Sequence, residues 1–301
     1  MPETPARPRT DDFVAPFQIE GEAVRGRIAR LGPAIDEILS RHAYPEPVAD
    51  LLGEACVLAA LVGASLKFQG RLIVQAQGDG PVRYVVCDYD TSGALRGYCR
   101  FDAEAVAAVS TGFARPGARS LLGDGLFVMT IDPVEMKDRY QGVTKIEGET
   151  LALCAEQYFA QSEQVPTRVR LAVSRQGGAW RAGGAMIQNV AEDDARGATA
   201  DAWERAQALF ETLGEDELVD ANLPAETLLY RLFHEDGVRL FPAKPLSAEC
   251  RCSEERVTGM LRAFPEADRA DMVEPDGHIH VTCEYCARDY RIEPAALTPT
   301  A

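Results

Sequence analysis

Four cysteines near the C-terminal end of the chain have the spacing of a metal site. Cys250 and Cys252 form a Cys-x-Cys pair, thirty residues follow, and Cys283 and Cys286 form a Cys-x-x-Cys pair. Structural zinc takes four ligands in a tetrahedron, and two closely spaced pairs are a usual way for a chain to supply them. The spacing therefore predicts one Zn²⁺ ion per chain, bound by all four thiolates.

Such a zinc site is predicted to be structural and not catalytic. Four sulfurs complete the tetrahedron and leave no open position for an activated water. His278 and His280 are near enough in sequence to compete as ligands, but we expect them to face solvent on a strand. A zinc deaminase would need His-x-Glu and a proline before the second cysteine pair. The chain offers neither at these positions, and no Ser-His-Asp or Gly-x-Ser-x-Gly arrangement is visible, so we do not expect an enzyme.

The remaining cysteines and histidines are predicted to be structural. The other four cysteines stand apart from one another among apolar neighbours, which is typical of buried thiols. His42 and His234 have no obvious chemical partners in the sequence. The cysteines expected in the core are Cys56, Cys87, Cys99 and Cys154.

Metal binding is predicted to decide whether the C-terminal segment folds. A module of about 55 residues is near the size at which an apolar core alone is marginal. Structural zinc contributes roughly 10 to 16 kcal/mol, against a net stability of about 5 to 15 kcal/mol for a typical domain. Zinc-bound cysteines are thiolates, the form that oxidants attack. The site is therefore also a candidate oxidation sensor.

The rest of the chain predicts an α+β fold with an antiparallel sheet and helices in the N-terminal domain. Apolar residues at helical spacing predict helices at 31–42, 45–68 and 149–164. Short β-like runs predict strands, including a hairpin around Pro133. The two Gly-Asp-Gly triplets at 78–80 and 123–125 are expected in hairpin turns, since neither has a phosphate-loop form. The expected strands are at 71–77, 83–90, 94–102, 126–132, 139–147, 167–174 and 183–190.

We predict three segments: a core domain at 1–190, an acidic helical linker at 191–245 and a zinc-binding domain at 246–301. The linker shows helical apolar stripes, and we expect them to pack against the first domain in the resting state. In the last segment, Ser253 is a predicted N-cap, and residues 278–292 read as a strand, a Cys-x-x-Cys turn and a strand.

Charge and composition exclude several kinds of partner. The chain has 301 residues and a net charge of -16, with 13 acidic against 5 basic residues in 191–245 and 11 against 6 in 246–301. An acidic C-terminal third repels phosphate backbones, so nucleic acid is not an expected partner. No run of eighteen apolar residues and no secretory signal is visible, which predicts a cytoplasmic protein without a membrane partner.

Several motifs together identify a family. The chain resembles the 33-kDa heat-shock proteins, redox-regulated holdase chaperones of bacteria, over nearly its whole length. The motifs are residues 42–70, VQAQGDGP, RYQGV, residues 148–168, AGGAMIQ, ETLLYRLFHED and the two cysteine pairs.

The resemblance implies a switch. The reduced form would bind zinc through Cys250, Cys252, Cys283 and Cys286 and be inactive. Peroxide or hypochlorous acid would form the disulfides Cys250 with Cys252 and Cys283 with Cys286, release the metal and unfold the C-terminal region. The protein would then dimerise and hold unfolded clients without ATP, leaving refolding to ATP-dependent chaperones. Such short disulfide loops add only about 1.5 to 2 kcal/mol each and do not join the two halves of the module.

One hypothesis from another class stays open. The folded zinc module could be a constitutive zinc-ribbon adaptor that docks a protein partner. Zinc removal would then abolish binding, whereas a holdase would gain activity. A thiol-disulfide exchange enzyme is less favoured, because the pattern around Cys283 and Cys286 lacks a thioredoxin-like βαβ unit.

Overall fold

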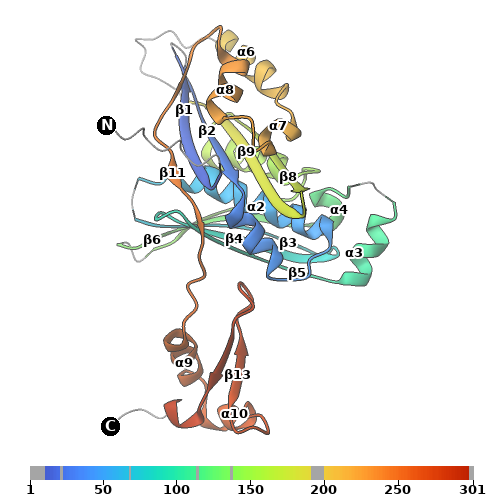
Figure 1. Cartoon of the computed structure of the whole chain (residues 1–301), viewed down its shortest axis with the longest axis vertical. Helices are drawn as coiled ribbons and strands as arrows, with labels where there is room; N and C mark the ends of the chain where they lie inside the picture. Colours follow the sequence, from blue (N-terminus) through green and yellow to red (C-terminus); the bar gives the residue numbers. More distant parts are fainter. Residues whose placement is uncertain are drawn as a thin grey trace, which may run out of the picture. The chain divides into compact units, whose positions relative to one another are not determined.

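The computed structural model describes residues 11–20, 23–67, 69–112, 115–135, 138–190 and 200–297. The chain divides into two compact units, Met1–Ala248 and Glu249–Ala301 (Figure 1). Helices and sheets occur in both units, which confirms the predicted α+β class. Residues 191–199, at the start of the predicted linker, and residues 1–10 lie outside the described residues. The three-part division of the chain stays a prediction.

The first sheet of unit 1 joins strands from both ends of the unit. Its strand order is β10-β1-β2-β9-β8, with β11 also pairing with β1, and every pairing is antiparallel. Its strands are β1 (Phe13–Ile19), β2 (Val24–Leu31), β8 (Thr167–Gln176), β9 (Ala179–Asn189), β10 (Val238–Leu240) and β11 (Lys244–Pro245).

The second sheet has the order β12-β5-β4-β3-β6-β7. Its pairings are antiparallel except for the short parallel pair of β12 with β5. Its strands are β3 (Gly70–Gly78), β4 (Val82–Asp90), β5 (Ala94–Phe101), β6 (Gly125–Pro133), β7 (Tyr140–Lys145) and β12 (Ser247–Ala248). The predicted hairpin around Pro133 is confirmed as β6 and β7.

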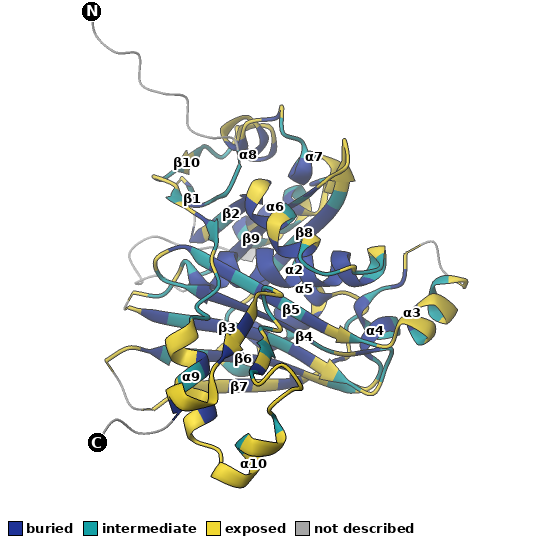
Figure 2. Cartoon of the chain, turned by 60° about the horizontal axis from the view of Figure 1, so that its bottom comes forward, coloured by how far each residue is buried: buried dark blue, intermediate teal, exposed yellow. Residues whose placement is uncertain are grey.

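One buried helix fills the space between the two sheets. Helix α2 (Glu46–Gly63) contacts strands of both, and almost all of its residues are buried (Figure 2). The helix has apolar residues on all sides, which is typical of a helix enclosed by protein. It ends at Gly63, five residues before the predicted end. The other helices around this core are α1 (Pro33–Ser40), α3 (Ala103–Ser110), α4 (Ala118–Leu122), α5 (Leu151–Tyr158) and the π-helix η1 (Phe159–Glu163).

Three helices of the predicted linker cover the first sheet. These are α6 (Ala200–Glu211), α7 (Glu215–Val219) and α8 (Ala225–Phe233). Phe210, Leu218 and Phe233 join one apolar cluster with Phe17 and Ile187 of the sheet. The prediction that the apolar stripes of this region pack against the first domain is confirmed.

The sequence did not predict two groups of strands. No strand was expected before residue 71, yet the long strands β1 and β2 lie there, and β11 lies directly before the predicted domain boundary after residue 245. Pro16 interrupts the pattern of β1, yet it lies within the sheet, where its carbonyl accepts a hydrogen bond from Phe241 N at 2.9 Å. The strands of two or three residues, β10 to β12, are too short to show a period.

The two Gly-Asp-Gly triplets dock against each other. Gly78-Asp79-Gly80 forms the predicted turn between β3 and β4, but Gly123-Asp124-Gly125 joins α4 to β6 and is not a hairpin turn. Gly80 N donates to Leu122 O at 2.8 Å, and Asp124 N donates to Asp79 Oδ1 at 2.8 Å. A Cβ at position 80 would lie 2.5 Å from Leu121 O, so this approach requires glycine.

Unit 2 is small. It contains α9 (Glu254–Arg262), α10 (Glu266–Asp271), the antiparallel pair β13 (Ile279–Thr282) and β14 (Asp289–Ile292), and the 3-10 turn η2 (Pro294–Leu297). Ser253 caps α9 as predicted, since its Oγ accepts from Arg256 N at 3.3 Å. The core consists of six buried side chains: Val257, Leu261, Ile279, Tyr290, Ile292 and Leu297.

Candidate metal centre

The four C-terminal cysteines lie on two loops of unit 2. Cys250 and Cys252 precede α9, and Cys283 and Cys286 lie in the turn between β13 and β14. Main-chain hydrogen bonds close this turn, from Cys283 N to Arg288 O at 2.9 Å and from Ala287 N to Cys283 O at 2.8 Å. The predicted strand, turn and strand are therefore present, with the second cysteine pair at the tip of the hairpin.

The structure brings the four sulfurs together. All four Sγ atoms lie within 4.8 Å of one another. The distance is 3.7 Å between Cys250 and Cys283 and 3.2 Å between Cys252 and Cys286. Zinc bound to four thiolates at about 2.3 Å has sulfurs about 3.8 Å apart. The cluster fits a tetrahedral metal ion with small adjustments, and the donor set of four sulfurs suits zinc.

No other group of this kind occurs in the described part of the chain. Among the described residues, these four cysteines are the only set of three or more His, Cys, Asp and Glu side chains whose ligand atoms converge. Each of the four is half-buried, so the site is reachable from solvent. A metal bound here would be accessible to chelators and small oxidants.

The thiols of the cluster do not titrate alike. Burial acts to raise the pKa of Cys252, but the neighbouring Tyr290 hydroxyl and the other three thiols outweigh it and lower the pKa to about 7. Burial raises the pKa of Cys283, and burial together with Cys252 raises the pKa of Cys286 to about 12. Without metal, Cys252 loses its proton near neutral pH, whereas Cys283 and Cys286 keep theirs. A bound cation would favour the full set of thiolates.

The two neighbouring histidines stay outside the cluster. His280 is exposed on β13, as predicted, and its Nε2 lies 2.9 Å from Asp276 Oδ2. His278 is half-buried, precedes β13 by one residue, and lies 3.1 Å from Arg291 Nη2 through its Nδ1. Both rings belong to a surface network around Asp276.

The other predicted structural residues lie in unit 1. Cys56, Cys87, Cys99 and Cys154 are all buried, as predicted. Burial raises the pKa of the last three, so these thiols are poor nucleophiles. The His42 ring lies 5.1 Å from Tyr44, and the His234 ring lies 5.4 Å from Tyr230.

Two groups of polar residues were not predicted from the sequence. The first is Tyr290 on β14, whose hydroxyl neighbours Cys252. Only its position in the strand after Cys286 could have indicated it. In unit 1, Arg115 binds Asp50 at 2.9 Å and Glu215 at 3.1 Å beside a cavity of about 130 Å³, which Glu54 also lines. These residues lie far apart in sequence, and no local pattern joins them.

Comparisons with known proteins match one family over nearly the whole chain. A profile of the family described as Hsp33 protein matches residues 12–293. A 33 kDa chaperonin of Caulobacter vibrioides is 69% identical over 288 residues, covering 94% of this chain and 95% of its own length. A 33 kDa chaperonin of Azotobacter vinelandii is 39% identical over 287 residues, covering 94% and 92%.

A solved structure is also similar. The crystal structure of the 33 kDa chaperonin, a heat shock protein 33 homolog, from Thermotoga maritima superposes with a TM-score of 0.79. It covers 95% of this chain and 96% of that chain at 21% identity, so it supports the fold. In the described part of the chain, none of the helices is both long and apolar enough to cross a membrane. From the profile match and the relatives' identity over nearly their full length, the chain belongs to the Hsp33 protein family.

Proposed function

We propose that the protein is a chaperone that holds unfolded proteins without ATP and is switched on by oxidation. The observation that carries the proposal is the convergence of the four sulfurs of Cys250, Cys252, Cys283 and Cys286 within 4.8 Å in a unit with a very small core. In the reduced state these thiolates bind one Zn²⁺ ion, which holds unit 2 folded. The family relationship and the names of the relatives support the chaperone class.

Oxidation removes the ligands. Each pair of thiolates gives two electrons to one peroxide, which is reduced to water while a sulfur–sulfur bond forms, so two peroxides convert the site and release the metal. We propose the pairs Cys250 with Cys252 and Cys283 with Cys286. The shortest sulfur contacts run between the pairs, from Cys250 to Cys283 and from Cys252 to Cys286. Mass mapping of the oxidised peptides therefore tests the pairing directly.

Disulfides within each pair do not replace the metal. Zinc links the segment before α9 to the β13–β14 turn, whereas each proposed disulfide closes a loop inside one of these segments. Six buried side chains remain to hold unit 2 together, and a core of that size is marginal. Unit 2 then unfolds on oxidation.

Unfolding extends to the linker and exposes apolar surface. In the folded state, helices α6 to α8 pack Phe210, Leu218 and Phe233 on the first sheet. Their release uncovers both apolar faces, which bind unfolded clients and favour a dimer of oxidised chains. Clients pass to ATP-dependent chaperones after reduction. The protein works in the cytoplasm, has no catalytic activity of its own and binds neither nucleic acid nor membrane.

The test follows zinc and holding activity together. Peroxide is titrated into the reduced, zinc-loaded chain while released zinc, far-UV circular dichroism and the light scattering of a heat-aggregating client are measured. We expect zinc release, loss of helical signal and protection of the client to rise together. Equal protection by reduced and oxidised protein would sink the switch, and retained structure after full zinc loss would contradict the unfolding step. The adaptor hypothesis predicts that zinc removal abolishes binding.

A further inference from the structure

The short helix α7 is held on the first sheet by a buried arginine that binds main-chain atoms. Arg30 on β2 is 1% exposed. It donates from Nη2 to Glu217 O at 2.9 Å and from Nη1 to Asp220 O at 2.8 Å and to Leu223 O. Among the described residues, these carbonyls are its only hydrogen-bond acceptors. The contact therefore exists only while residues 217–223 keep their backbone conformation.

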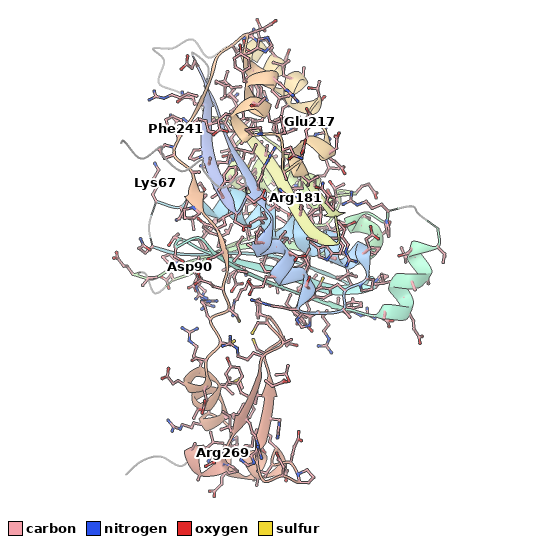
Figure 3. The ribbon with its side chains drawn as sticks, viewed as in Figure 1. Lys67, Asp90, Arg181, Glu217, Phe241 and Arg269 are labelled. Carbon is pink, nitrogen blue, oxygen red and sulfur yellow. The ribbon has the colours of Figure 1, made fainter. Side chains whose placement is uncertain are left out.

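These carbonyls need a donor. Glu217 belongs to the last turn of α7, Asp220 caps its C-terminal end, and Leu223 lies in the loop before α8. Carbonyls at a helix end and in a loop have no donor inside the helix, and leaving such a group buried and unpaired is costly. Arg181 on β9 supplies a second donor, from its Nε to Val219 O at 2.8 Å. Figure 3 labels Arg181 and Glu217, which lie on the sheet and on α7 respectively. Two guanidinium groups thus hold the C-terminal end of α7 and the loop that follows it.

A glycine lets α7 come close enough for these bonds. A Cβ at Gly183 on β9 would lie 2.2 Å from Leu218 O and 2.8 Å from Leu218 C. Both are backbone atoms of α7, and real Cβ atoms do not approach backbone this closely. Gly183 has no positive φ, so alanine there is excluded by α7 alone and not by its own backbone.

We propose that Arg30 and Gly183 are positioning residues that make α7 the latch of the linker. Leu218 is fully buried and Val219 nearly so, which places α7 at the centre of the apolar contact of α6 to α8 with the sheet. A small displacement of α7 breaks the Arg30 bonds before water can reach the guanidinium, so partly open states are disfavoured. The linker then opens as a unit when unit 2 unfolds.

Two variants and two matched controls test the latch in the reduced, zinc-loaded full chain. Gly183→Ala adds a methyl group against α7, and Gly112→Ala adds one where the nearest atom, Val109 O, lies 3.7 Å away. Arg30→Met removes the donors. Asp220→Asn removes a nearby charge but keeps the side-chain oxygen that accepts from Asn222 N at 2.8 Å. Hydrogen exchange is measured by mass spectrometry, together with zinc content.

We expect Gly183→Ala and Arg30→Met to speed exchange at residues 200–233 at least tenfold, with bound zinc and exchange at 250–297 unchanged. Both controls should stay within twofold of the wild type. The proposal is overturned if Gly183→Ala exchanges at the wild-type rate, or if exchange rises throughout unit 1 in that variant. It is also overturned if Asp220→Asn opens the linker as much as Arg30→Met, because an ion pair would then be the lock.

The consequence for activity rests on the proposed function. Gly183→Ala should protect a client from aggregation without peroxide, to at least a fifth of the protection given by oxidised wild type. If oxidised wild type gives no protection, the proposed function fails while the exchange result still stands. If the linker opens in Gly183→Ala without any gain in protection, release of α7 is not the step that activates the protein.

Discussion

At the scale of single residues, the four cysteines can act as one site because all four sulfurs lie within 4.8 Å of one another. The spacing of the two pairs in the sequence was enough to find them. Arg30, Arg115 and Glu54 could not be found in this way, because each acts on atoms supplied by distant segments. Arg30 in particular binds main-chain carbonyls, and every residue type has a carbonyl, so no sequence pattern marks its partners.

The first prediction concerns a single ligand. Cys286→Ser removes one thiolate from the cluster, and we expect zinc affinity to fall at least 100-fold. Removing a group that only hydrogen-bonds to a metal ligand typically costs roughly 10- to 100-fold. The measurement is competition with a colorimetric chelator on reduced protein. Cys154→Ser, which changes a buried thiol of unit 1, is the matched control and should keep one zinc per chain.

The second prediction concerns pH. Glu54 is half-buried on α2 beside Arg115, Asp50 and Glu215, and burial raises its pKa from an ordinary 4.5 to about 8, against the opposing attraction of Arg115. Between these values the folded chain holds a proton that the unfolded chain has lost. The stability of unit 1 therefore falls as pH rises from about 4.5 to about 8 and levels off above.

Glu54→Gln removes this titration. The variant should be more stable than the wild type by about 1 to 3 kcal/mol at pH 8 and close to it at pH 5. Urea unfolding at the two pH values measures the difference, and Glu104→Gln, at an exposed position on α3, controls for the loss of one charge. A variant less stable than the wild type at pH 8 would show that Glu54 is held as a carboxylate.

At the scale of elements, the sequence predicted those with a clear period and missed those that depend on pairing. Strands β3 to β6 were expected within one residue of their observed bounds, and α2 was expected with an end five residues too late. Strands β10 to β12 form because β1 and β5 offer hydrogen-bonding edges, and two or three residues carry no period of their own. Residues 238–248 therefore become strands only through their pairing with β1 and β5, which the local sequence does not show.

The third prediction compares a buried and an exposed aromatic side chain of α8. Phe233 is 1% exposed and its ring lies 6.1 Å from that of Phe17, whereas Tyr230 on the same helix is 63% exposed. Phe233→Ala should destabilise the packed linker by about 3 to 5 kcal/mol, since it leaves a cavity. Binding of an apolar dye to reduced protein should rise in Phe233→Ala and stay unchanged in Tyr230→Ala. Equal dye binding by both variants would show that α8 contributes little to closure.

At the scale of the whole molecule, the chain divides after Ala248, and we expect only the second unit to need metal in order to fold. Unit 1 has two large apolar clusters, one between the sheets and one under α6 to α8, whereas unit 2 has six buried side chains. Chelation should therefore unfold unit 2 and leave the core of unit 1 intact. Loss of zinc acts as a switch only if the unfolding of unit 2 also releases α6 from the first sheet.

The two tryptophans can answer this question, because both lie in unit 1 but pack in different apolar clusters. Trp180 on β9 is 8% exposed in the cluster between the sheets, and Trp203 on α6 packs at the edge of the linker cluster. In Trp180→Phe, the remaining Trp203 should shift its emission to longer wavelength on peroxide treatment, in step with zinc release. In Trp203→Phe, the remaining Trp180 should not shift, because its packing does not involve the linker. A constant Trp203 emission through complete zinc release would confine the unfolding to unit 2, and a shift of Trp180 would mean that oxidation unfolds the core as well.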